Sequence, residues 1–85
     1  MKESTRILKA LANRRRLAIL KYLVNREASV GEISKAIKLS FRATSKHLII
    51  LTSVDVIEKE QRGLQMFYSL ASDMPKLAHE VISLV

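Results

Sequence analysis

Residues 29–51 read SVGEISKAIKLSFRATSKHLIIL, and this stretch predicts two short helices joined by a tight turn. Ser29 and Glu32 have the S-x-x-E spacing of a capping box, in which each side chain satisfies a free backbone N–H at a helix start. One apolar helix face follows at the spacing i, i+3, i+7 and consists of Val30, Ile33 and Ile37. Lys38 and Leu39 then interrupt the pattern and form the break between the two helices.

The second helix of the pair is predicted to start at Ser40, because serine accepts hydrogen bonds from the free N–H groups of a helix start. Its inner face carries Thr44, Leu48 and Leu51, with His47 beside it. Its outer face carries Arg42, Ser45, Lys46 and Ile49. A short, cationic outer face suits the major groove of DNA, where Arg, Lys, Ser and Thr read base edges. A helical hairpin with a merely solvated charged face is the alternative that this stretch alone leaves open.

The charge of the chain is unevenly distributed. The 85 residues include 15 Lys and Arg against 8 Asp and Glu, a formal net charge of +7. Residues 1–46 hold twelve basic and three acidic residues, whereas residues 47–85 hold three basic and five acidic ones. The basic excess therefore lies in and before the second helix of the pair. Such a field attracts polyanions, with nucleic acid first and anionic membranes second.

Length and composition limit the class of protein. A chain of 85 residues with 48% hydrophobic residues predicts one globular domain over residues 1–85. The absence of cysteine excludes disulfides, thiolate metal sites and a cysteine nucleophile. The longest apolar run, Leu48 to Leu51, is far shorter than the ~20 residues that span a bilayer, and the N-terminus has no signal-peptide pattern. We therefore expect a cytoplasmic protein without a membrane partner.

Two further helices are predicted before this pair. Ser4 or Thr5 is expected to cap the first. Asn13 is expected to interrupt the chain and to cap the second, which continues over residues 14–24. Three arginines, residues 14–16, occupy its first turn, the end of the helix dipole that disfavours cations. Contact with phosphate or with an acidic partner would explain this placement, and so would arginine stems that lie over the core with their heads in water.

A β-hairpin is predicted after the pair. Residues 57–61 and 65–70 form two short segments, the second clearly alternating, and a glycine-containing loop separates them, a pattern typical of a hairpin. Arg62 and Gly63 would place a cation at the tip, where it could reach a minor groove or a phosphate. An ordinary exposed turn arginine is the alternative.

The last helix is predicted to follow the capping residues Ser72 and Asp73, with Pro75 in its first turn, where the missing N–H is tolerated. Exposure of its terminal apolar residues Leu84 and Val85 would be costly in a small monomer, and a partner subunit would offset it. We therefore expect a homodimer formed by the terminal helices. The expected interface contains Ile7, Leu8, Leu77, Val81 and Leu84.

This order of elements predicts a mainly α winged helix-turn-helix fold with a small β-hairpin wing. From about Leu8 to Leu70 the sequence also resembles the ArsR-type transcriptional repressors. The resemblance rests on four pieces in the order and spacing of that family. They are Leu11-Ala12-Asn13 with Arg16-Leu17-Ala18-Ile19-Leu20, Val30-Gly31-Glu32-Ile33 with Leu39-Ser40, Ser45-Lys46-His47-Leu48 with Leu51, and Arg62-Gly63 with Tyr68-Ser69-Leu70.

The residue pattern and the resemblance together predict a homodimeric repressor that binds double-stranded DNA and uses no cofactor. Its phosphate contacts would be Ser40, Lys35 and Lys38, its base contacts Arg42, Ser45, Lys46 and, through a thymine methyl group, Phe41, and its wing contact Arg62. His47 matches a family position and would pack or contact phosphate. A winged helix that binds an acidic protein instead of DNA is the alternative function.

The sequence departs from the family pattern at several positions. Asp55 stands where glycine is frequent after the recognition helix, and Thr44 makes the core beneath that helix more polar. Phe41, Arg42 and Ile49 replace other residues on the surface expected to face DNA, so the operator sequence cannot be transferred from relatives.

Neither a catalytic site nor a metal site is predicted. His79-Glu80 resembles the start of an H-E-x-x-H motif, but position 83 is Ser83 and not a second histidine. Some family members bind zinc on the last helix through Asp, His and Glu, and this chain has Asp73, His79 and Glu80. Because neighbouring residues on a helix point in different directions, His79 and Glu80 do not point at one ion.

Overall fold

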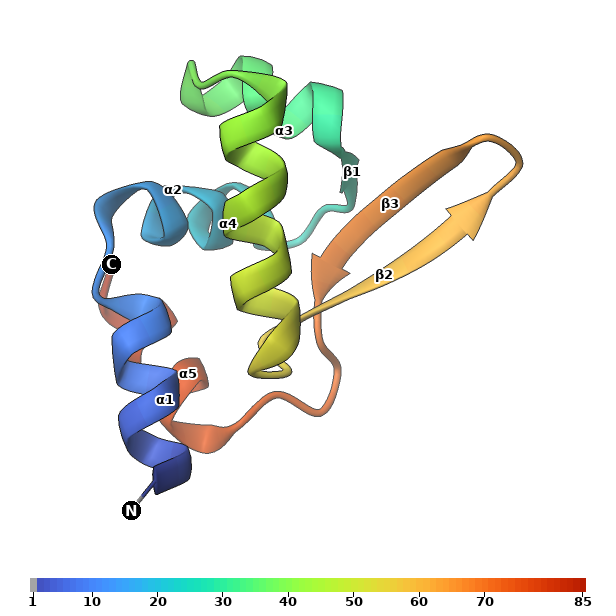
Figure 1. Ribbon diagram of the computed structural model, residues 1–85. Coiled ribbons are helices and arrows are strands. Elements are labelled where there is room, and N and C mark those ends of the chain that lie inside the picture. The colour runs from blue at the N-terminus through green and yellow to red at the C-terminus, as the bar shows by residue number, and fades with distance from the viewer. Residues whose placement is uncertain (1) are drawn as a thin grey trace.

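The computed structural model describes residues 2–85, in which five helices and three short strands occur. The helices are α1 (Lys2–Leu11), α2 (Arg14–Tyr22), α3 (Val30–Ile37), α4 (Phe41–Ser53) and α5 (Lys76–Leu84). The strands are β1 (Ala28–Ser29), β2 (Ile57–Arg62) and β3 (Gln65–Leu70), which form an antiparallel sheet in the order β1-β3-β2. This is the predicted winged helix-turn-helix, with α3 and α4 as the helix pair and β2–β3 as the wing (Figure 1).

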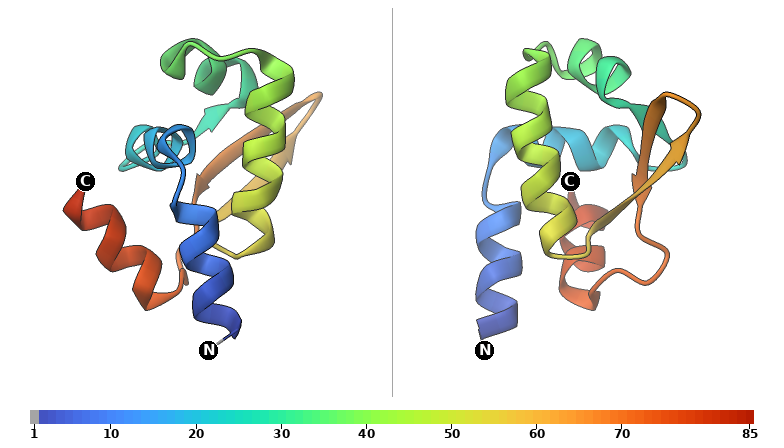
Figure 2. Two further views of the ribbon diagram at one scale, coloured as in Figure 1. Left: turned by 60° about the vertical axis from the view of Figure 1, so that its left-hand side comes forward. Right: turned by 45° about the vertical axis from the view of Figure 1, so that its right-hand side comes forward.

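The wing projects from the helical body on the side away from α1 (Figures 1 and 2). Helix α1 packs against α2, α4 and α5, and α2 packs against α3 and α4. The recognition helix α4 is therefore supported from behind by the first two helices. None of the helices in the described part of the chain is long and apolar enough to cross a membrane.

The predicted capping residues explain where α3 and α4 begin. The Glu32 N–H donates to Ser29 Oγ at 3.2 Å, and the Ser29 N–H donates to Glu32 Oε1 at 2.8 Å, so both halves of the capping box are present. The Ala43 N–H donates to Ser40 Oγ at 3.1 Å at the start of α4. Between the two helices, Lys38 ends α3 in the left-handed conformation, with φ of +56°. The prediction of two helices with a break at Lys38 is confirmed.

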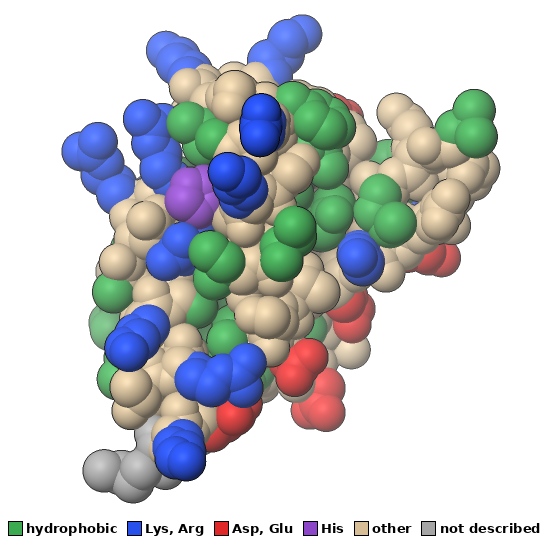
Figure 3. All heavy atoms as spheres, viewed as in Figure 1, with side chains coloured by type: hydrophobic (Ala, Val, Ile, Leu, Met, Phe, Trp, Pro, Cys, Tyr) green, Lys and Arg blue, Asp and Glu red, His purple; other side chains and the backbone are tan. Residues whose placement is uncertain are grey.

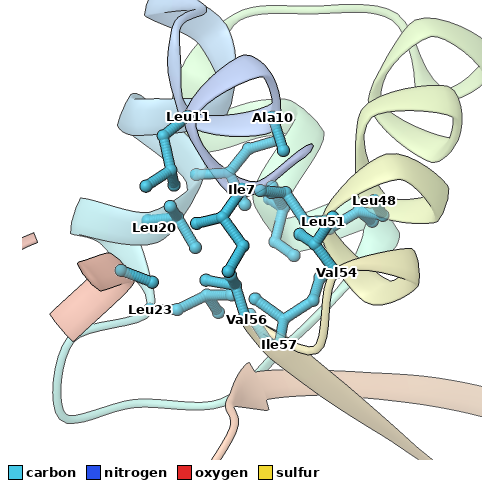
Figure 4. Close-up of a cluster of buried hydrophobic side chains, with 14 residues drawn as sticks. Ile7, Ala10, Leu11, Leu20, Leu23, Leu48, Leu51, Val54, Val56 and Ile57 are labelled. Carbon is cyan, nitrogen blue, oxygen red and sulfur yellow. The ribbon is translucent and has the colours of Figure 1, made fainter. Parts of the chain in front are cut away.

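The hydrophobic core lies between α1, α2 and α4 and continues into β2 (Figure 4). Its buried apolar residues are Ile7, Ala10, Leu11, Ile19, Leu20, Leu23, Ala28, Ile33, Leu48, Leu51, Val54, Val56, Ile57 and Ala78. The predicted inner face of α4, with Thr44, Leu48 and Leu51, is fully buried against this cluster. Burial of this face fixes which side of α4 is left for solvent or a partner.

Two boundaries in the first half of the chain differ from the prediction. Helix α1 begins at Lys2, so Ser4 and Thr5 lie inside it and do not cap it. The early start is favourable because Glu3 in the first turn complements the helix dipole and forms an i,i+3 ion pair with Arg6. Helix α2 ends at Tyr22, two residues early, because the chain turns and Asn25 takes a left-handed φ of +62°.

The segment before α3 contains a short strand that the sequence pattern does not indicate. Ala28 is buried and pairs with Tyr68, and Ser29 pairs with Phe67, which adds β1 to the wing sheet. A strand of two residues has no periodicity, so only the partner strand defines it. The Gly63–Leu64 turn is shorter than predicted, since Arg62 belongs to β2, and Gly63 supplies its positive φ of +62°.

The start of α5 also differs from the prediction. Pro75 is the N-cap of the helix and not a residue of its first turn, and no side chain caps this end. The ψ of Pro75 is 141°, which is extended, while its carbonyl already accepts from the His79 N–H at 3.1 Å. Helical dihedrals can therefore begin only at Lys76.

Candidate nucleic-acid interface

The outer face of α4 presents the residues predicted to contact bases. Arg42 and Lys46 are exposed, and Ile49 beside them is 68% exposed. Ser45 is half-buried, and its hydroxyl donates to the Phe41 carbonyl at 2.9 Å. The lone pairs of Ser45 Oγ therefore remain available to accept from a base amino group. Two cations and one acceptor thus lie on a single exposed helix face.

The N-terminus of α4 is arranged to bind an anion. Ser40 Oγ satisfies only the N–H of Ala43, so the N–H groups of Phe41 and Arg42 have no partner within the helix. Free N–H groups and the positive end of the dipole attract phosphate. Lys35 and Lys38, on α3 and at its end, are exposed in the same helix pair.

Positive charge surrounds α4. Figure 3 views the face that carries α4 and shows Lys and Arg side chains over its upper and left parts. Acidic side chains lie at its lower and right edges. The charge asymmetry found along the sequence thus becomes an asymmetry across one face of the molecule.

Two of the three arginines at the start of α2 bind the C-terminal ends of other helices. Arg16 donates from Nε to the Ala10 carbonyl and from Nη2 to the Lys9 carbonyl at 3.2 Å, in the last turn of α1. Arg15 Nη1 donates to the Ile37 carbonyl, the end of α3, at 3.3 Å. A cation is favourable at a helix C-terminus, so both residues offset the poor placement in their own helix.

His47 joins α4 to this arginine cluster. Its Nδ1 lies 3.2 Å from Arg16 Nη1. Because a guanidinium only donates, Nδ1 must be the acceptor, and the ring is then neutral with its proton on Nε2. Burial lowers the pKa of His47, and the positive charges of Arg16 and Arg15 lower it further. Of the two roles expected for His47, this contact corresponds to packing, and the Nε2 proton is left for another partner.

Arg62 on the wing is engaged by carboxylates. Its Nη1 and Nη2 bind both oxygens of Glu27, with Nη2 to Oε2 at 2.9 Å, and Nη2 also binds Glu60 Oε1 at 2.7 Å. The guanidinium carbon lies 5.0 Å from the centre of the Phe67 ring. The hydrogen bonds from Arg62 hold the pKa of the Glu27 carboxyl below its usual value. The structure therefore does not bring Arg62 together with the cations of α4.

Comparison with known proteins identifies the family. Residues 13–59 match the model of the "Bacterial regulatory protein, arsR family". The chain belongs to the ArsR family. It is 40% identical over 76 residues to the transcriptional activator HlyU of Vibrio cholerae, a match that covers 89% of this chain and 70% of HlyU. A solved structure of V. cholerae HlyU has a TM-score of 0.85 at 36% identity and is matched over 98% of this chain and 87% of its own.

Two further relatives agree with this assignment. The homodimeric winged helix-turn-helix DNA-binding domain of Mb0332 from Mycobacterium bovis has a TM-score of 0.84 at 30% identity, covering 98% of this chain and 74% of that chain. The nodulation protein NolR of Rhizobium meliloti is 36% identical over 66 residues, which are 78% of this chain and 54% of NolR. This ArsR-family chain is thus a transcriptional regulator.

The turn of the wing carries an exposed large hydrophobic residue that the sequence reasoning did not select. Leu64, at the tip, is fully exposed. It lines a hollow of about 340 Å³ between the wing and the start of α4, together with Phe41 and Met66. The position of Leu64 in the predicted loop between the two strands was the available signal, since a hairpin loop of this kind is usually exposed to solvent.

The residues expected at a dimer interface fall into two groups. Ile7 is 3% exposed and packs in the core of the single chain, so it offers little surface to a partner. Leu8 on α1 and Leu84 on α5 are exposed, at 50% and 84%, while Leu77 and Val81 are half-buried.

Among the described residues, no group of three or more His, Cys, Asp or Glu is placed to hold a metal ion.

Proposed function

We propose that this ArsR-family regulator is a homodimer that binds double-stranded DNA at a two-fold related operator and represses transcription by occupying it. The observation that carries the proposal is the exposed face of α4, with Arg42 and Lys46 opposite a fully buried stripe and within the cationic face of the molecule. A helix of this kind fits the major groove and can reach base edges.

Each residue of the interface has a role that its chemistry supports. Arg42 and Lys46 donate to base acceptors, Ser45 accepts, and Phe41 contacts a thymine methyl group. Ser40 and the free N–H groups at the start of α4 bind phosphate, assisted by Lys35 and Lys38. Arg62 acts from the wing once it exchanges a carboxylate for a phosphate. His47 holds α4 through its contact with Arg16 and offers its Nε2 proton to a phosphate of the DNA backbone.

The dimer is supported by the exposed apolar residues of the terminal helices and by the homodimeric relative Mb0332. In such a dimer the two α4 helices would enter successive major grooves, about one helical turn or ~34 Å apart. Repression requires only that the occupied operator overlaps the promoter. Transcription in vitro from a promoter with the selected operator should therefore fall as the protein is added, and a rise would show an activator, as HlyU is named.

The test of DNA binding is fluorescence anisotropy of a labelled duplex titrated with the full chain over a range of salt. Log affinity should fall linearly with log salt, with a slope of about −0.9 for each phosphate neutralised. Lys46→Glu should weaken binding strongly and leave the circular dichroism melting curve unchanged. Lys76→Glu, the same charge change on α5, is the matched control and should have a much smaller effect. Absence of wild-type binding at low salt would overturn the proposal and favour a protein partner.

A further inference from the structure

A hollow of about 460 Å³ lies between α2 and α3 and outside the interface proposed above. Its lining consists of Arg14, Arg15, Ala18, Lys21 and Tyr22 from α2 with Ala36 and Ile37 from α3. Three of these seven residues are cationic and none is acidic. Small side chains leave the space between the cations open, Ala18 in the middle of α2 and Ala36 in the last turn of α3.

No ion pair in the described part of the chain involves the cations of this hollow. Arg15 is held in place by the Ile37 carbonyl, but only one of its N–H groups is used there. Within residues 2–85, the side chains of Arg14 and Lys21 are exposed and make no ion pair or hydrogen bond. Arg14 also begins α2, where the positive end of the dipole adds to its charge. An anion bound here would reduce the repulsion among the three cations and the repulsion between Arg14 and the positive end of the α2 dipole.

We propose that this hollow binds the sugar-phosphate backbone of the same DNA duplex that α4 reads, as a second phosphate-binding track. The inference rests on the proposed function. Arg14 and Lys21 are seven residues apart, about 10 Å along α2, with Ala18 between them on the same face. A single phosphate group cannot bridge that distance, whereas a DNA strand carries one charge per ~3.4 Å of axis and can contact both.

The hollow lies near the recognition helix. Arg15, in its lining, is followed in the chain by Arg16, whose Nη1 lies 3.2 Å from His47 Nδ1 on α4. Both arginines are close enough to His47 to lower its pKa. The hollow is therefore close enough to α4 for the field of its arginines to reach that helix.

The test measures DNA binding by the full chain as a function of salt for wild type, Arg14→Gln/Lys21→Gln and a control. The control, Lys59→Gln/Lys76→Gln, removes the same two charges from β2 and α5, outside the lining. The Arg14/Lys21 variant should flatten the slope of log affinity against log salt by about 1.8 and weaken binding at least tenfold at physiological salt. The control should retain the wild-type slope. Melting curves confirm that both variants fold.

Three other outcomes would overturn the proposal. A wild-type slope in the Arg14/Lys21 variant, with Lys46→Glu still defective, would remove the hollow from the DNA site and leave the proposed function intact. Failure of the wild-type protein to bind DNA would overturn both the proposed function and the second phosphate-binding track. Sub-millimolar binding of pyrophosphate by wild type but not by the Arg14/Lys21 variant, measured by calorimetry and combined with an unchanged DNA slope, would assign the hollow to a free anion.

Discussion

At the scale of single residues, Thr44 is placed where a hydroxyl is costly. Its side chain lies fully buried under α4, and among the described residues its Oγ1 is the one buried side-chain oxygen or nitrogen without a hydrogen-bond partner. An unsatisfied buried polar group costs about 1–3 kcal/mol. The recognition helix is therefore held less firmly than its apolar stripe would allow.

Thr44→Val should raise the free energy of unfolding by about 1 kcal/mol, because it replaces the unpaired hydroxyl with a methyl group of similar shape. Urea denaturation measures the change. Thr52→Val is the matched control, since the Thr52 hydroxyl donates to the Leu48 carbonyl at 2.7 Å. That variant should gain no stability. A loss of stability in Thr44→Val would contradict the assignment of an unpaired hydroxyl.

His47 predicts a pH dependence of stability. Burial and the charges of Arg16 and Arg15 lower its pKa below the ordinary 6.5, so the unfolded chain takes up this proton more readily than the folded one. The contribution of His47 is complete above pH 6.5 and is lost as the pH falls toward the folded pKa. The free energy of unfolding should therefore decrease between pH 7.5 and pH 5. In His47→Gln the decrease should be smaller, and an equal decrease would show that His47 is not its source.

At the scale of elements, arginines connect the helix ends to one another. Arg16 binds the end of α1, Arg15 the end of α3, and Arg6 the Ser53 carbonyl at the end of α4, at 3.3 Å. Each contact places a cation at the negative end of a helix dipole. The wing is attached in a different way, by the pairing of β1 with β3 and by the ion pair between Arg62 of β2 and Glu27 ahead of β1. Hydrogen bonds from arginines to helix-end carbonyls thus connect the helices to one another, whereas an ion pair with a carboxylate helps to connect the wing.

Glu27→Gln should increase DNA affinity several-fold, because it removes a negative charge and releases Arg62 for phosphate. The slope of log affinity against log salt should steepen by up to about 0.9 if Arg62 gains one phosphate. Glu58→Gln on β2, the strand of Arg62, is the control. It removes an equal charge from a residue that makes no ion pair with Arg62, and it should leave the slope unchanged. Equal behaviour of the two variants would mean that Arg62 stays with Glu60 or in solvent when DNA binds.

At the scale of the whole molecule, apolar surface is left uncovered where α1 and α5 lie together. Helices α1 and α5 pack on each other, yet Leu8 and Leu84 remain exposed on them. A C2 dimer would bury the same residues twice. It would also hold two α4 helices at a fixed separation, so a palindromic operator could be bound by both at once.

Leu84→Ser should weaken dimerisation by about 10²- to 10⁴-fold, because the dimer buries Leu84 twice and each buried leucine contributes ~1.5–3 kcal/mol. Sedimentation equilibrium of the full chain measures the effect. Leu64→Ser, which removes an equally exposed leucine from the wing tip, should leave the association unchanged. A monomeric wild type at high micromolar concentration would contradict the dimer.

Much of the fold was predictable because its signals are local. Asn13, Ser29 and Ser40 cap the helices that the sequence assigns to them, and each contacts an N–H only two or three residues away. The hairpin was predictable because a glycine lies between its two segments. One boundary that differs, at Pro75, is a helix start without a side-chain cap, for which adjacent residues carry no decisive signal.

The order of the five helices and the hairpin, the buried stripe of α4 and the face of α4 that stays exposed follow from the sequence alone, since periodicity and capping act over a few residues. The partners of the cations depend on the tertiary structure. Arg62 meets Glu27 across 35 residues, Arg16 meets His47 across 31, and Ala28 becomes a strand because Tyr68 lies beside it. These pairings depend on how the helices pack around one core, because folding brings together side chains that no local pattern relates.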